Sequence, residues 1–183
     1  MTTDISTRYR ALAEEFTRRV DAVPNDRWDD PSPCQEWSAR DVLSHMIDNH
    51  VNMPGHAGVK VALKKSVDDD PRGAWAEARD AVQEILDDPE RAGAEYDGYF
   101  GRTSIEQTID DFLGFDLLVH AWDIARATGQ DETLPEEEVR RVYDLSRSLG
   151  DMVRTEGVCG PEVSVPEDAP LQDRLLGWLG RTP

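Results

Sequence analysis

Apolar residues recur at spacings of three and four along most of this chain, and this period constrains the fold more than any other feature. The first such segment carries Ile5, Tyr9, Leu12, Phe16 and Val20. Side chains at this spacing share one face of an α-helix, so the pattern predicts amphipathic helices that pack on a common core. We expect helices over residues 4–22, from residue 38, over 71–87, from 104 to about 127, and from Pro135 onward.

Residues with helix-capping chemistry mark several of these helix ends. Ser38 precedes Asp41 by three positions and Ser104 precedes Gln107 by three, which is the spacing of a capping box. Thr128-Gly129 suits a helix C-terminus, because glycine readily adopts the left-handed conformation. Pro54-Gly55 predicts a break after the second helix. The residues of the fourth helix that follow the helical period are Ile105, Ile109, Phe112, Leu113, Leu117, His120 and Ile124.

The segments outside the helices carry little β pattern. Residues 88–103 are rich in glycine and aromatic residues and predict a loop with an extended piece, while 160–166 predict extended chain and 169–179 a short helix. The fold class is therefore all-α, a four-helix bundle with an extra helix and a short C-terminal tail. A length of 183 residues suits one domain over 1–183, with a core over about 4–155 and a tail over 160–183.

Acidic residues outnumber basic ones, and the formal net charge is −18. Phosphate backbones attract Lys and Arg, so this excess argues against a nucleic-acid partner. Residues 1–10 are polar and unlike a signal peptide, and no apolar run approaches the ~20 residues of a membrane helix. We expect a cytoplasmic protein without a membrane partner, in which Cys34 and Cys159 are reduced thiols.

An acidic and an imidazole side chain lie four positions apart in the fourth predicted helix. Asp116 and His120 are separated only by Leu117-Leu118-Val119. At this spacing the two side chains project from one helix face, with Cβ atoms about 5–6 Å apart. Because an unpaired buried carboxylate is costly, something must compensate Asp116, and a divalent metal would do so. His45, on the second predicted helix, can supply a third ligand, and three ligands with an open position are typical of catalytic zinc.

A metal-free interpretation of the same residues remains open. Asp116 would then be hydrogen-bonded to His120, and His45 would be a core histidine with its own partner. The Asp-x-x-x-His spacing alone occurs often by chance. For the metal itself, zinc is the first choice, with nickel and iron as alternatives, since imidazole–carboxylate sites accept several metals.

The two remaining histidines are weaker ligand candidates. His50 follows His45 by five positions, which is a poor match to one helical face. His56 follows the predicted break and is expected on a loop. His50 can share a stripe of its helix with Leu43 and Met46, or it can be exposed to solvent, as can His56; neither is a first choice for the ligand set.

Three other residues have a functional and a structural interpretation each. Asp123 lies three positions after His120, so it can orient an imidazole or form a salt bridge to Arg126 or another helix. Cys34 precedes a helix N-terminus, which can lower a thiol pKa and give a redox role, although a packing thiol is the simpler interpretation. Arg174 in the tail can bind a carboxylate or simply lie on the surface.

Three stretches together resemble one actinobacterial protein family. Residues 31–45 (Pro-Ser-Pro-Cys-Gln-Glu-Trp-Ser-Ala-Arg-Asp-Val-Leu-Ser-His) resemble its second-helix signature. Residues 116–129, with the core His-Ala-Trp-Asp-Ile-Ala-Arg-Ala-Thr-Gly, resemble its second ligand helix, and residues 160–183 resemble the tail of its short members. The family is similar to the N-terminal, metal-binding domain of mycothiol-dependent maleylpyruvate isomerase.

The resemblance implies a DinB/YfiT-like four-helix bundle in which two histidines and a carboxylate bind a divalent metal. It maps these ligands to His45, His120 and Asp116, and it implies the thiol mycothiol as cosubstrate of members that are enzymes. The isomerase carries glutamate where this chain has Asp116, and it has an additional C-terminal domain that residues 160–183 are too few to supply. The resemblance therefore supports the metal site more strongly than it supports the isomerase reaction.

The sequence leads to one functional hypothesis and two rivals. The first is a metal-dependent isomerase or S-transferase that joins a small-molecule thiol to a small electrophile. The second is a non-catalytic metal-binding or stress-related bundle, and the third is a metal-free interaction protein. A homodimer and a monomer are both compatible with the sequence.

Overall fold

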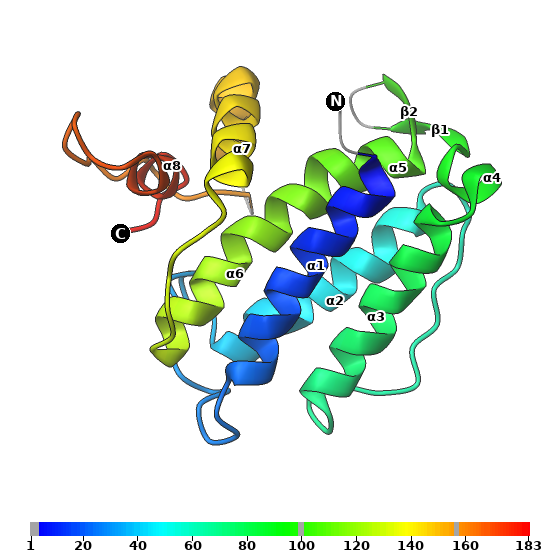
Figure 1. Cartoon of the computed structure of the whole chain (residues 1–183), viewed down its shortest axis with the longest axis horizontal. Coiled ribbons are helices and arrows are strands. Elements are labelled where there is room, and N and C mark those ends of the chain that lie inside the picture. The colour runs from blue at the N-terminus through cyan, green and yellow to red at the C-terminus, as the bar shows by residue number, and fades with distance from the viewer. Residues whose placement is uncertain (1–3, 99–100, 156–157) are drawn as a thin grey trace.

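Four long helical segments pack side by side in the computed structural model, which describes residues 4–98, 101–155 and 158–183. They are α1 (Ile5–Ala22), α2 (Ala39–Gly55), α3 (Pro71–Leu86) and a segment that ends in α6 (Gly114–Thr128). α1 and α2 each contact both α3 and α6, so the four segments close a bundle (Figure 1). The all-α bundle predicted from the sequence is confirmed.

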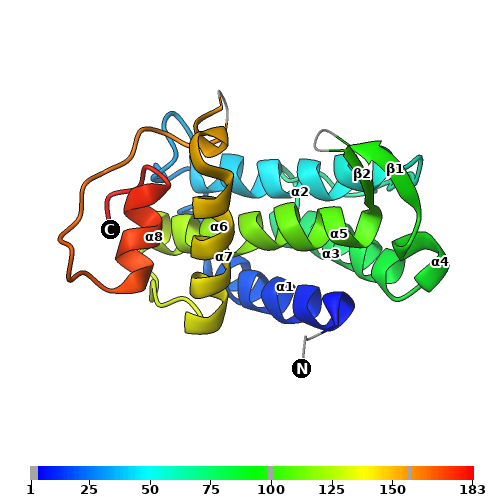
Figure 2. The same ribbon diagram turned by 90° about the horizontal axis from the view of Figure 1, so that it is seen from above.

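The ends of the bundle carry smaller elements. One end holds α4 (Pro89–Ala92) and an antiparallel hairpin of β1 (Glu95–Gly98) and β2 (Gly101–Ser104), whereas α8 (Leu171–Trp178) lies at the other (Figure 2). The expected extended piece in residues 88–103 is thus a hairpin, although Tyr99 and Phe100 lie outside the described residues. The predicted short tail helix is confirmed as α8.

Some of the predicted helix ends are confirmed and others form only in part. The reciprocal box at α2 forms, since Asp41 N–H donates to Ser38 Oγ at 3.2 Å and Ser38 N–H donates to Asp41 Oδ2 at 2.8 Å. At the fourth helix only the Ser104 half forms, because the Gln107 side chain donates to Asp111 instead. Gly129 ends α6 at a φ of 70°, as predicted, whereas α2 continues through Pro54 to Gly55.

The fourth predicted helix is interrupted by a π-helical turn. It begins as α5 (Ile105–Thr108), passes through the π turn η1 (Ile109–Leu113) and continues as α6. Such a turn closes i→i+5 hydrogen bonds and holds one more residue than an α turn. The prediction that Phe112 faces inward is wrong for this reason, because its side chain is 36% exposed while its neighbour Leu113 is buried.

An arginine from α1 packs against the π turn. Arg8 Nη1 donates to the backbone carbonyl of Asp110 at 3.1 Å and to its carboxylate at 2.6 Å. A Cβ at position 114 would lie 2.7 Å from Arg8 Nη1, so Gly114 leaves the room that this guanidinium needs. The arginine thereby ties α1 to the helix that carries Asp116 and His120.

The hydrophobic core runs through the bundle and into the C-terminal elements. After α6 come α7 (Glu136–Leu149), a short 3₁₀ turn η2 (Gly150–Arg154) and α8, and α7 contacts both α6 and α8. One buried cluster contains Phe16, Val42, Trp75, Leu117, Val142 and Leu175. Among the described helices, none has the combination of length and apolarity that a membrane crossing requires.

Candidate metal centre

The contact between α2 and α6 brings His45 to Asp116 and His120. Each of these side chains offers one ligand atom, and within the described part of the chain the three atoms all lie within 4.8 Å of one another. The His45 and His120 rings are 5.1 Å apart between centroids. Two imidazole nitrogens and a carboxylate oxygen gathered in this way form a donor set that suits a divalent ion such as zinc.

Asn49, one turn after His45, connects two members of this cluster. Its amide Nδ2 donates to Asp116 Oδ2 at 2.8 Å and lies 3.0 Å from His45 Nε2. Since an amide NH₂ group only donates, this contact is a hydrogen bond in the form of His45 whose Nε2 is unprotonated. Burial by itself raises the pKa of Asp116, but the contacts with His45, His120 and Asn49 outweigh burial and hold this pKa below its ordinary value. The cluster thus combines an ionised carboxylate with two imidazoles, and a metal ion binds such a set when the imidazoles are neutral.

The three side chains of the cluster differ in their exposure to solvent. The side chain of His45 is 30% exposed, that of Asp116 is 18% exposed and that of His120 is 8% exposed. The Trp37 ring lies against the imidazoles, at 5.0 Å from the His45 centroid and 6.5 Å from the His120 centroid. A small molecule can therefore approach from the His45 side, while His120 is anchored in the protein.

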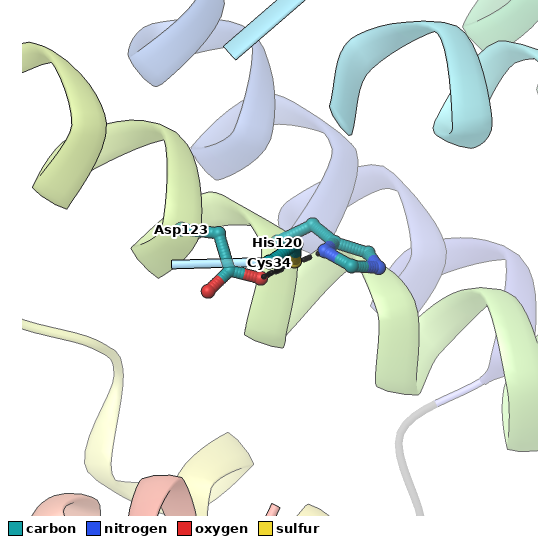
Figure 3. Close-up of side chains that lie close together, drawn as sticks. All are labelled: Cys34, His120 and Asp123. Carbon is teal, nitrogen blue, oxygen red and sulfur yellow. Dashed lines mark hydrogen bonds and ion pairs between the residues drawn. The ribbon is translucent and has the colours of Figure 1, made fainter. Parts of the chain in front are cut away.

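Asp123 lies behind His120. Its Oδ2 atom is 2.9 Å from His120 Nδ1, and Figure 3 shows the carboxylate directed toward both His120 and Cys34. Arg181, which follows α8, donates to Asp123 Oδ1 from Nε at 3.2 Å and to Oδ2 from Nη2 at 2.8 Å. Burial raises the pKa of Asp123, yet the His120 hydrogen bond and the Arg181 charge lower it well below its ordinary value. Asp123 is therefore an ionised, acceptor-only group.

The thiol of Cys34 is a donor in this arrangement. Its Sγ atom lies 3.3 Å from Asp123 Oδ2 and 3.6 Å from Arg181 Nη2. Burial, followed by the charge of Asp123, raises the pKa of Cys34 to about 12. The alternative of a thiolate activated by a helix N-terminus is therefore wrong. Cys34, His120 and Asp123 also lie within 4.8 Å of one another, but the guanidinium of Arg181 already compensates this second group.

The hydrogen-bond or stacking partners of His50, His56 and Arg174 are not members of the ligand cluster. His50 is completely buried, as are Leu43 and Met46, and its Nδ1 lies 2.6 Å from the Met46 carbonyl oxygen. Of the two possibilities for His50, exposure is therefore wrong and the shared stripe is confirmed. His56 is exposed and stacks on Tyr96, as expected of a residue after the helix end. Arg174 donates to the Tyr143 hydroxyl at 3.2 Å.

The hydrogen bonds differ from those of the metal-free interpretation. Asp116 accepts from Asn49, whereas His120 bonds Asp123 rather than Asp116. The salt bridge of Asp123 is formed with Arg181, and Arg126 pairs with Glu132 instead. The roles of His45, Asp116 and His120 as ligands and of Asp123 as their support stay predictions, now with a geometry that accommodates them.

Sequence reasoning missed two functional neighbours of the cluster. Asn49 carried a usable signal, since it lies four positions after His45 and so on the same helical face. Arg181 carried none, because it is 58 positions from Asp123 and only the folded tail brings it there.

Comparison with known proteins places these observations in a family context. The family model described as mycothiol maleylpyruvate isomerase N-terminal domain matches residues 9–125, a range that includes His45, Asp116, His120 and Asp123. Two uncharacterized proteins of Mycobacterium tuberculosis, Rv0738 of strain H37Rv and MT0763 of strain CDC 1551, are each 28% identical to this chain over 179 residues. Those alignments cover 95% of this chain and 96% of each relative. No solved structure matches the chain significantly.

Proposed function

We propose that this chain, which belongs to the mycothiol maleylpyruvate isomerase N-terminal domain family, binds a divalent metal and uses it to present the sulfur of a small thiol to a small electrophile. The reaction class would be isomerisation or S-transfer, with mycothiol as the thiol. The observation that carries the proposal is the convergence of His45, Asp116 and His120 on one point between α2 and α6.

These three side chains would hold the ion, with zinc as the first choice and nickel or iron as alternatives. When bound, the ion would supply Lewis acidity that lowers the pKa of a thiol at the open position. The protein's own contribution is to hold both imidazoles in a fixed position and orientation. Asn49 does this for His45, and Asp123 does it for His120.

The properties of the cysteines support an external thiol. Burial raises the pKa of both Cys34 and Cys159 above the ordinary value. Neither side chain is therefore a thiolate at neutral pH, and Cys34 is engaged as a donor to Asp123. A sulfur nucleophile at this site has to arrive with a substrate, and the greater exposure of His45 gives it a side from which to approach.

The first test measures metal and thiol separately. Elemental analysis of the purified protein should give about one zinc, nickel or iron per chain, and calorimetry with the metal-loaded protein should detect mycothiol binding. Metal without thiol binding at millimolar concentration would favour a non-catalytic metal-binding protein. Absence of metal even after reconstitution would favour the metal-free interaction protein.

The second test uses the carboxylate. Asp116→Asn replaces a charge with a neutral amide of the same size, so the variant should fold while binding metal weakly. Ligand that binds only the folded state raises its stability, and removing the metal with a chelator should therefore lower the melting temperature of the parent. The same chelator should leave Asp116→Asn almost unchanged. Equal shifts in both proteins would exclude Asp116 from the ligand set.

A further inference from the structure

Arg181 is a buried cation in the segment that follows α8, and it binds Asp123 at the back of the candidate metal centre. The side chain is only 9% exposed. Besides its two bonds to the Asp123 carboxylate, it donates from Nη1 to the Leu179 carbonyl at 3.0 Å and approaches Cys34 Sγ. Burying a guanidinium is expensive, and the paired carboxylate compensates this cost only where the geometry is good. The arrangement is bidentate, which is the strong form of such a pair.

The ion pair determines which nitrogen of His120 carries the proton. Asp123 Oδ2 also accepts from Arg181 Nη2 and Cys34 Sγ, so it faces His120 as an acceptor and the ring presents a proton on Nδ1, 2.9 Å away. In the neutral form of the ring the lone pair then resides on Nε2, the other ring nitrogen. Without the arginine, Asp123 would lose the two hydrogen bonds that fix the orientation of its carboxylate, and Oδ2 would no longer be held against His120 Nδ1. His120 would then be free to adopt the other tautomer or another ring orientation.

We propose that Arg181 is a positioning residue of the metal centre, which acts through Asp123 to hold His120 with Nδ1 protonated and Nε2 available to the ion. The proposal rests on the proposed function for its metal, but the chain Arg181–Asp123–His120 belongs to the protein itself. It makes the C-terminal tail a component of the site, although the ligands lie on α2 and α6.

A purely structural role of the tail is the alternative, and the chain offers a matched control for it. Arg154 also fastens the tail, since it donates to the Gly160 carbonyl at 2.7 Å and to the Trp178 carbonyl, and it stacks over the Trp178 ring. Its interactions are with the tail backbone and Trp178, not with Asp123. Arg154→Met should thus loosen the tail without removing the charge that faces the carboxylate.

The experiment compares Arg181→Met, Arg181→Lys and Arg154→Met with the parent. Nitrogen NMR of the metal-free proteins reports the tautomer of His120, and competition with a chelating dye reports the zinc dissociation constant. Arg181→Met should lose the single Nδ1-protonated form and weaken zinc binding about 10–100-fold, the usual range when a group supporting a ligand is lost. Arg181→Lys keeps the charge but cannot form the bidentate contact, so its zinc affinity and its tautomer population should lie between those of Arg181→Met and the parent. Arg154→Met should lower the melting temperature and leave the tautomer and zinc affinity as in the parent.

Several results would overturn the proposal. One is a parent-like tautomer and zinc affinity in Arg181→Met; another is an equal loss in Arg154→Met, which would reduce Arg181 to a fastening of the tail. If Arg181→Met fails to fold, parent-like values in Arg181→Lys would overturn it instead. A parent that binds none of zinc, nickel and iron would defeat the proposed function, and the tautomer measurement would still decide the role of Arg181.

Discussion

Asp110 and Asp123 are buried carboxylates on the same helical segment, and each meets an arginine from a distant part of the chain. Asp110 Oδ1 lies 2.6 Å from Arg8 Nη1, and its other oxygen pairs with Arg141 from α7. Asp123 lies 2.8 Å from Arg181 Nη2 and 2.9 Å from His120 Nδ1. The two carboxylates are alike in burial and in having an arginine, but they differ in their second partner.

That second partner separates an ion cluster that is complete in itself from one that adjoins the proposed metal ligands. Around Asp110 the partners are cations that only donate, and Arg8 also binds Glu138, so the cluster is complete in itself. Around Asp123 the second partner is the imidazole of His120, which also belongs to the group with Asp116 and His45. Burial and ion pairing are therefore common to both clusters, and it is the Asp123 cluster that adjoins the proposed metal ligands.

The largest expected effect is the loss of metal when a ligand histidine is removed. His45→Ala or His120→Ala should abolish stoichiometric zinc binding, because each removes one of three donors. His56→Ala should retain zinc, since His56 is exposed and stacks on Tyr96. Metal content per chain, measured by elemental analysis, checks this. Equal zinc in His45→Ala and the parent would remove His45 from the site.

The cluster of Asp110 and Arg8 should respond to mutation with a loss of stability and not with a loss of metal. Arg8→Met leaves the Asp110 carboxylate and Glu138 without their shared cation, and breaking a buried pair from one side costs about 3–5 kcal/mol. Urea unfolding should show this loss in the free energy of unfolding, while the zinc dissociation constant of the folded variant should not change. Weakened zinc binding without a loss of stability would erase the distinction between the two clusters.

His50 extends the comparison to a buried polar group whose hydrogen bond is to a backbone carbonyl, that of Met46. It is packed against Trp75 at 4.9 Å between ring centroids, and burial lowers its pKa from 6.5 to about 4. Between these two pH values the unfolded chain takes up a proton that the folded chain refuses, so stability is lost as the pH falls from 6.5 toward 4. The full loss is about 3 kcal/mol, and it levels off below pH 4.

Unfolding curves of the metal-free protein across this pH range test the prediction. His50→Leu cannot titrate, so its stability should fall less steeply than that of the parent over the same interval. Parallel pH profiles of the two proteins would show that His50 is already charged in the folded state, contrary to its burial.

The smallest effect is expected at the start of α2. Ser38→Ala removes the acceptor of the Asp41 N–H bond, and loss of such a cap costs about 1 kcal/mol. Because His45 lies almost two turns further along α2, zinc binding should remain while the melting temperature falls slightly. A cap variant with weakened zinc binding would show that the ligand helix has to be rigid along its whole length.

The sequence was sufficient for the features that depend on local periodicity. Apolar spacing predicted the helices of the bundle, and the four-residue spacing of Asp116 and His120 put them on one face. The sequence was insufficient where a single inserted residue or a single distant contact decides whether a side chain is buried. The π turn turned Phe112 outward, and the burial of His50 depends on packing against Trp75 from another helix. Arg181 joins the site only through tertiary structure, because nothing in its immediate sequence distinguishes it from a surface arginine.

The π turn also has a consequence for how relatives should be aligned with this chain. It accommodates one residue more than the α-helix on either side of it, so α5 and α6 would keep their places if one residue of the turn were lost. A relative with an uninterrupted helix should therefore align with this chain through a one-residue gap within 109–113. In such a relative the carboxylate equivalent to Asp116 would stand one position closer to the serine that begins the helix, with its spacing to the following histidine unchanged.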